Sequence, residues 1–137
     1  MAIYQCVVPQ GAIAVELRPR IAAELTRIHC EATSAAPEFV QVVFVDVPPG
    51  AAFAAGRPST MSNIAGYIRA GRSPEVRTQL FHRIHAAWTE LTRLPAETVK
   101  ITLFDVPSGW IMQDGRPMPE PGRDAEWLAA GTAGRGP

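Results

Sequence analysis

Two arginines in the stretch "IRAGRSPEV", Arg69 and Arg72, form the first candidate binding site. Ser73 and Pro74 follow them and are typical of a helix N-cap and first helical position. Unpaired backbone N–H groups and the helix dipole favour an anion at such a position. Two guanidiniums beside it can hold a carboxylate in bidentate fashion. The alternative interpretation is a pair of solvated loop arginines.

His29 is the second candidate. On a helix, at 100° per residue, it lies roughly 40° from Leu25 and roughly 80° from Ile21, at the margin of an apolar stripe. A histidine at that margin can face a pocket and orient a substrate. The alternative is a histidine that forms a hydrogen bond with the backbone near the end of the helix.

A second histidine motif, "HRIH", pairs His82 with His85 at a spacing that can hold a metal ion. Both residues fall on the polar side of their predicted helix, and no third ligand is near in the sequence. We therefore expect a solvated helix face and no metal.

A repeat positions these residues. The segment "VVFVDVPPG" at 42–50 returns as "ITLFDVPSG" at 101–109, so that Asp46 falls on Asp105, a shift of 59 residues. The same shift places "AIYQCVVPQG", from Ala2, on "MSNIAGYIRA", from Met61. It also aligns two apolar helix stripes, which are Leu17, Ile21, Leu25 and Ile28 in the first copy and Val76, Leu80, Ile84 and Ala87 in the second.

Each copy thus predicts a strand, a helix and a strand. The expected fold class is α+β, with βαβ units at about 2–48 and 61–107 forming a four-stranded mixed sheet with two helices on one face. The bare face would need a partner, such as another subunit. An ordered arm at 109–128, lying over a neighbour, would complete a single domain at 1–128, and 129–137 is expected to be a flexible tail.

Composition excludes several functions. Thirteen basic and thirteen acidic residues give no net charge, so we expect neither nucleic acid nor an anionic membrane as a partner. No apolar run approaches the roughly 20 residues of a membrane span, and "MAIYQCVVPQ" lacks the features of a signal peptide, which predicts a cytoplasmic protein. The two cysteines, Cys6 and Cys30, are expected to be free thiols.

The repeat, the arginine pair and the arm together resemble the tautomerase superfamily, specifically its cis-3-chloroacrylic acid dehalogenase-like group. The most specific pieces are "FVQVVF", "GRSPEVRTQLFHRI" and "GRPMPEPGRDAEW", and the likeness runs to about Leu128. It implies a cofactor-free homotrimer that acts on a small carboxylate through an N-terminal proline amine. It also implies that His29 is the family's helix histidine and that Arg69 and Arg72 are its carboxylate-binding arginines.

Three positions depart from the family pattern. Ala2 stands in place of the proline, Thr102 in place of a strand tyrosine, and Gln113 in place of the water-activating glutamate on the arm, next to Asp114, a further candidate pocket residue. Glutamine cannot take up a proton at neutral pH, and threonine is a far weaker acid than tyrosine. Efficient dehalogenation is therefore not expected.

A primary amine can still serve as a base. If Met1 is removed, Ala2 supplies an α-amine whose pKa two nearby arginines would lower. If Met1 is retained, the amine moves outward by about 3.3–3.6 Å, and a site built around Ala2 is expected to lose its base.

Two functions remain open from the sequence. The first is a weak or altered isomerase or lyase that carries out enol–keto isomerisation or hydration of a small unsaturated or 2-oxo carboxylate. Arg69 and Arg72 would hold the carboxylate and His29 would orient the substrate. The alternative is a non-catalytic carboxylate-binding or scaffold trimer that has lost its acid–base residues.

Overall fold

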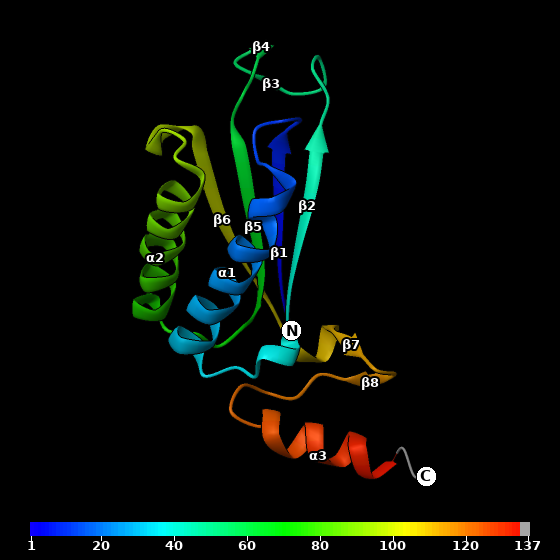
Figure 1. The fold of residues 1–137 in the computed structure, drawn as a ribbon. Coiled ribbons are helices and arrows are strands. Elements are labelled where there is room, and N and C mark those ends of the chain that lie inside the picture. The colour runs from blue at the N-terminus through cyan, green and yellow to red at the C-terminus, as the bar shows by residue number, and fades with distance from the viewer. Residues whose placement is uncertain (135–137) are drawn as a thin grey trace.

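A computed structural model of the chain describes residues 1–134 and places two long helices on one face of a four-stranded sheet (Figure 1). The strands β1 (Ala2–Pro9), β2 (Val40–Val47), β5 (Ser62–Arg69) and β6 (Val99–Val106) lie in the order β2-β1-β5-β6. The outer pairs are parallel and the central pair β1–β5 is antiparallel. Helices α1 (Arg18–Thr33) and α2 (Pro74–Thr92) form the crossovers. The predicted fold class is confirmed.

Four 3-10 turns and two short hairpins join these elements. The turns are Val15–Leu17, Pro37–Phe39, Ala96–Thr98 and Ser108–Trp110. One hairpin pairs β3 (Phe53–Ala54) with β4 (Arg57–Pro58), and the other pairs β7 (Met112–Gln113) with β8 (Arg116–Pro117). In Figure 1 the two hairpins lie at opposite ends of the sheet, and β7–β8 lies at the end that carries the N-terminus.

The repeat differs in one detail from its prediction. The closing strands Val40–Val47 and Val99–Val106 are related by the predicted shift of 59, and so are the C-terminal ends of the two helices. The opening strands are related by 60, because Ala2–Pro9 corresponds to Ser62–Arg69. The alignment of Ala2 with Met61 was therefore wrong by one residue. Side chains alternate between the two faces of a strand, so a slip of one would turn every core residue outward.

The hairpins extend the repeat beyond its predicted limits. The sequences "FAAGRP" at 53–58 and "MQDGRP" at 112–117 both form two-residue turns, and both turn residues have positive φ. This is the type I′ pattern, whose twist matches the flanking strands. The hairpin β3–β4 lies between the two predicted copies, and β7–β8 lies in the predicted arm. The turn residues are Ala55 (52°), Gly56 (73°), Asp114 (54°) and Gly115 (73°).

The core lies between the sheet and the two helices. Ser73 caps α2 as predicted, since its Oγ accepts a hydrogen bond from the Val76 N–H at 3.2 Å. The inward-facing strand residues and the helix stripes form one buried apolar cluster. Its members include Tyr4, Cys6, Val8, Ile21, Leu25, Ile28, Ile64, Ile68, Leu80, Ile84, Trp88 and Leu103.

The opposite face of the sheet is uncovered in the single chain. Phe104 on β6 and Val45 on β2 are each 45% exposed, and the ring of Phe104 stacks on that of Tyr67 at 5.0 Å. Thr102 lies on the same strand and is exposed.

The arm packs on its own chain rather than only on a neighbour. Phe39, Ile111 and Met118 form a second buried cluster, and the Trp127 ring meets Phe39 edge-on at 5.4 Å. Helix α3 (Asp124–Gly134) follows the arm. Helix α3 extends through residue 134 into the segment 129–137, for which the sequence predicted a flexible tail; residues 135–137 lie outside the described part. Within residues 1–134, no helix is long and apolar enough to cross a membrane.

Candidate active site

Strand order brings the predicted site residues to one end of the sheet. Because β1 and β5 are antiparallel neighbours, the start of β1 lies beside the end of β5, and Ile3 pairs with Tyr67. Ala2, at the start of β1, and Arg69, at the end of β5, therefore lie at the same end of the sheet. The last turns of α1 add His29, and the connection to α2 adds Arg72. It is the lower end of the sheet in Figure 1.

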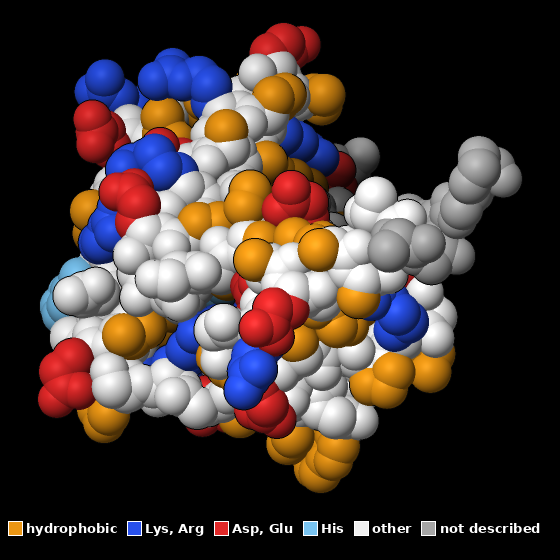
Figure 2. Space-filling view, turned by 90° about the horizontal axis from the view of Figure 1, so that it is seen from below, with side chains coloured by type: hydrophobic (Ala, Val, Ile, Leu, Met, Phe, Trp, Pro, Cys, Tyr) orange, Lys and Arg blue, Asp and Glu red, His pale blue; other side chains and the backbone are white. Residues whose placement is uncertain are grey.

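Figure 2 views the molecule from that end. Acidic and basic side chains are interspersed with apolar ones, and neither sign of charge dominates this face. The view agrees with the zero net charge of the chain. Any anion site here must be built from a few local groups.

Tyr4 and His29 form the most buried polar pair of the site. The Tyr4 hydroxyl oxygen lies 2.7 Å from His29 Nδ1, and the side chains are 0% and 2% exposed. Burial, with the nearby charge of Arg72, lowers the pKa of His29 to about 4, and burial raises the pKa of Tyr4. Both groups are therefore neutral at pH 7.

The protonation states determine how the pair can act. A protonated Tyr4 hydroxyl can donate to His29 Nδ1, which then leaves the ring proton on Nε2. In that tautomer Nε2 is a hydrogen-bond donor. His29 can then polarise or orient a substrate oxygen. Sequence reasoning missed Tyr4, although its inward position in β1, two residues after Ala2, was a usable signal.

Arg72 is half-buried and has donors to spare. Its Nη1 donates to the Thr33 carbonyl oxygen at 3.1 Å, and its Nε is buried without a hydrogen-bond partner among the described residues. Burial and the neighbouring charge of Arg69 lower its pKa. A buried unpaired N–H is costly, so an anion that accepted this hydrogen bond would be stabilised.

Arg69, in contrast, already holds a carboxylate of the same chain. Its Nη1 and Nη2 donate to Oδ1 and Oδ2 of Asp124, both at 2.9 Å, and Nη1 also donates to the Pro119 carbonyl oxygen at 2.9 Å. The guanidinium lies over the Phe39 ring, 5.2 Å from its centroid, and Arg69 is 2% exposed. Its fork is thus largely occupied from within the protein.

Asp124 is the second residue that sequence reasoning missed. It begins α3, 55 positions after Arg69, and its Oδ2 also accepts the Ala36 backbone N–H at 2.9 Å. Burial alone would raise its pKa, but the hydrogen bonds from Arg69 and Ala36 lower it overall, so the carboxylate is ionised at pH 7. An acidic residue at a helix start in "GRDAEW" was the available signal.

The N-terminal amine lies in the same electrostatic environment. Burial and the charge of Arg69, partly offset by Asp124, lower the pKa of the Met1 α-amine to about 5. That amine is a free base at neutral pH. The sequence predicted that retention of Met1 would carry the base away from the site, yet both arginines still act on this amine.

Two predicted residues are not joined to this group within one chain. Thr102 lies in mid-strand on the bare sheet face, opposite Ala65 on β5. Gln113 is half-buried in β7, opposite Arg116. Among the described residues, no hydrogen bond links either side chain to His29 or to the two arginines.

The opposite end of the sheet shows that the repeat did not duplicate the site. By the structural correspondence, Trp88 occupies the place of His29, Ile64 that of Tyr4, and Ser62 that of Ala2. Trp88 is 1% exposed, and its Nε1 has no partner in the described part of the chain. The acid–base and cationic groups are therefore gathered at one end only.

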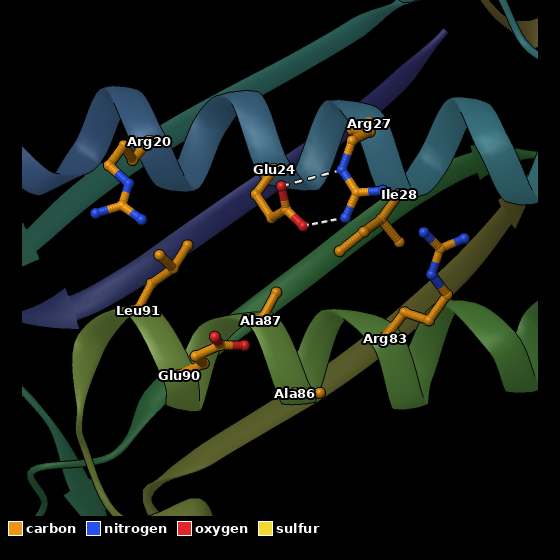
Figure 3. Close-up of a pocket in the computed structure, with 9 residues that line it drawn as sticks. All are labelled: Arg20, Glu24, Arg27, Ile28, Arg83, Ala86, Ala87, Glu90 and Leu91. Atoms are coloured by element: carbon orange, nitrogen blue, oxygen red, sulfur yellow. Dashed lines mark hydrogen bonds and ion pairs between the residues drawn. The ribbon is translucent and has the colours of Figure 1, made fainter.

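A groove of about 370 Å³ between α1 and α2 lies apart from these groups (Figure 3). Arg27 pairs with Glu24 and Glu31 along α1, and Arg83 of α2 lies 3.3 Å from Glu31. Exposed ion pairs of this kind contribute little stability, and they engage Arg27 and Arg83 of the groove. We assign the groove no binding role.

The "HRIH" motif lies on α2. His82 is exposed, and Nε2 of His85 lies 3.0 Å from the Ala96 carbonyl oxygen. In residues 1–134, no cluster of three or more histidine, cysteine or acidic side chains could hold a metal ion.

No protein-family model and no curated protein matches the chain. Solved structures do. The crystal structure of N1, a member of the cis-3-chloroacrylic acid dehalogenase family, is 33% identical, with 93% of this chain and 90% of that chain covered and a TM-score of 0.87. Native Ps01740 is 32% identical over 81% of this chain and 99% of that chain, with a TM-score of 0.78. Native fused 4-OT has 20% identity, coverage of 84% and 94%, and a TM-score of 0.75.

The doubled βαβ sheet and these likenesses define a protein of the tautomerase superfamily. Within it, the chain belongs to the cis-3-chloroacrylic acid dehalogenase family.

Proposed function

We propose that this protein binds a small unsaturated or 2-oxo carboxylate at the end of the sheet and catalyses its enol–keto isomerisation or hydration without a cofactor. The observation that carries the proposal is the position of neutral His29, held by Tyr4 beside Arg72. Arg72 supplies a charge and an unpaired N–H for the carboxylate, whereas the charge of Arg69 is paired with that of Asp124. His29 Nε2 would donate to the substrate's carbonyl or enol oxygen.

The N-terminal amine is the proposed base. Its pKa, lowered to about 5 at Met1, makes it a free but weak base at neutral pH, which favours slow turnover. If Met1 is removed, the Ala2 nitrogen takes this role from the start of β1. Efficient dehalogenation is not proposed, because Thr102 and Gln113 cannot serve as acid and base. Ala2 would then stand where the family has its catalytic proline.

We further propose that the protein is a homotrimer. The exposed apolar side chains of the bare sheet face, Phe104 and Val45 among them, support burial against sister subunits. Fused 4-OT proteins are described as trimers, and they share this fold. In a trimer, Thr102 and Gln113 of one subunit would complete the site of another.

The second candidate function is a carboxylate-binding or scaffold trimer without catalysis. The separation of Thr102 from the His29 group within one chain, and its lack of acid–base character, favour this candidate.

Two measurements test the proposal. The intact mass of the natively expressed protein shows whether Met1 or Ala2 bears the amine. Small enols and unsaturated acids are then assayed with wild-type protein and with Arg72→Met and His29→Gln variants. We expect turnover that both substitutions reduce by at least about tenfold, equivalent to about 1.4 kcal/mol. Carboxylate binding without turnover would favour the scaffold, and turnover that is unaffected by Arg72→Met would refute the proposed site.

A further inference from the structure

The two arginines of this site differ in how far they are already paired within the protein. This difference affects which carboxylates can bind. Arg69 gives both of its Nη atoms to Asp124 and is 2% exposed, whereas Arg72 is half-buried and keeps an unpaired Nε. A bidentate guanidinium–carboxylate pair is among the strongest polar contacts in proteins. Breaking it would leave two charges unpaired in a buried place.

We propose that Asp124 is a specificity-determining residue, which holds Arg69 in an internal ion pair and leaves Arg72 alone to bind the carboxylate of a monocarboxylic acid. This inference rests on the proposed function and divides the work of its two arginines. Arg69 is then a positioning residue. It fixes the arm and the start of α3 against the end of β5, because Pro119 and Asp124 both accept from it.

The charge states of the site residues support these different roles for the two arginines. Arg69 and Asp124 cancel, and His29, Tyr4 and the terminal amine are neutral at pH 7. Arg72 remains the uncompensated charge of the group. One carboxylate neutralises it, whereas a second carboxylate would find no further unpaired cation in this group of described residues.

The contacts of Asp124 indicate that a substrate carboxylate does not displace it from Arg69. Its Oδ2 accepts from the Ala36 N–H as well as from Arg69, so both carboxylate oxygens are engaged. The Phe39 ring covers the guanidinium, and Trp127 packs edge-on against Phe39. A carboxylate that displaced Asp124 would have to replace these contacts together.

The test compares two acids that share a carbon chain and differ at its far end. 2-Oxopentanoate ends in a methyl group and 2-oxoglutarate in a second carboxylate. Isothermal titration calorimetry gives the dissociation constant of each acid for wild-type protein and for the Asp124→Asn variant. We expect wild-type protein to bind 2-oxopentanoate at least about tenfold more tightly. The Asp124→Asn variant frees the Arg69 charge and should reduce this preference to about threefold or less.

Two further variants separate specificity from a merely structural effect. Glu120→Gln removes an acid from the same arm, one that accepts from Ser108 at 2.5 Å and, within the described residues, forms no ion pair with Arg69, so the preference should stay at its wild-type value. The double substitution Arg69→Met with Asp124→Leu removes the pair and keeps the net charge. It should retain the preference for the monocarboxylate, and it serves if the single variant does not fold.

The outcomes distinguish the two proposals. Equal affinity of wild-type protein for both acids, or a preference that Asp124→Asn leaves unchanged, would overturn this inference while the carboxylate site stood. Loss of all binding in a folded double variant would also overturn it, because Arg69 would then be a direct ligand. If wild-type protein bound neither acid, the proposed function would fail and the inference with it.

Discussion

The Tyr4 hydroxyl lies 2.7 Å from His29 Nδ1, and this hydrogen bond joins the central strand β1 to the helix that crosses over it. The two rings meet edge-on, with centroids 5.6 Å apart, and both residues are buried. The contact holds His29 in position and, with the Tyr4 hydroxyl as donor, places the ring proton on Nε2. It therefore connects the stability of the core to the chemistry of the site.

Replacing Tyr4 with phenylalanine should expose this connection. The Tyr4→Phe variant leaves His29 Nδ1 buried without its partner, which should lower the free energy of unfolding by about 1–3 kcal/mol. Urea denaturation measures the loss. Tyr67→Phe is the matched control, because no hydrogen bond within residues 1–134 involves the Tyr67 hydroxyl, and its change should stay within about 0.5 kcal/mol. Equal losses in the two variants would show that the Tyr4–His29 bond contributes nothing.

The low pKa of His29 predicts how stability depends on pH. The unfolded chain takes up a proton on His29 near pH 6.5, whereas the folded protein resists it until about pH 4. Stability should therefore fall as pH is lowered across this window, by at most about 3 kcal/mol from this residue.

A His29→Gln variant isolates this contribution. The Met1 amine acts in the same direction between pH 8 and about 5, so the informative quantity is the difference between wild-type and variant protein. Urea denaturation at a series of pH values should show a shallower decline for the variant between pH 6.5 and 4. Parallel curves would mean that His29 is protonated as easily in the folded protein as in the unfolded chain.

The close packing around Gly66 allows a steric test of the core beside Tyr4. A Cβ placed on this residue of β5 would lie 2.7 Å from both Leu103 Cδ2 and Tyr4 Cε1, which are buried. Gly66→Ala should lower the free energy of unfolding by about 1–3 kcal/mol and disturb the Tyr4 ring. Gly109→Ala is the control, because its Cβ would meet nothing within 4 Å. Thermal unfolding of both variants would refute this account if their midpoints fell equally.

The fold was predictable because its signals are local and occur twice. The apolar stripes, the Ser73 cap and the repeated strand endings each specify structure over a few residues. The register of the opening strands was not predictable, since the alignment of the helices does not reveal one extra residue in a connection. The two hairpins were not predicted, because "FAAGRP" and "MQDGRP" share only their last three residues and neither shows the apolar alternation of a strand.

The site was predictable only in part. Arg69, Arg72 and His29 were predicted as site residues from their types and positions, and the structure brings them together at one end of the sheet. Asp124 was not, because its contact with Arg69 spans 55 residues and depends on how the arm folds back. Tyr4 escaped notice because an inward tyrosine in a strand is ordinarily a core residue.

The bare sheet face gives the last prediction, which tests the proposed trimer. Phe104 is 45% exposed on the bare sheet face and stacks on Tyr67, so a charge there would have to be buried in any assembly that used this face. Phe104→Asp should therefore shift the protein from trimer to monomer, measured by sedimentation velocity. Val15, 68% exposed in the turn before α1, provides the control, because Val15→Asp adds the same charge elsewhere and should leave a trimer intact. A Phe104→Asp protein that remained trimeric would place the subunit interface on another surface.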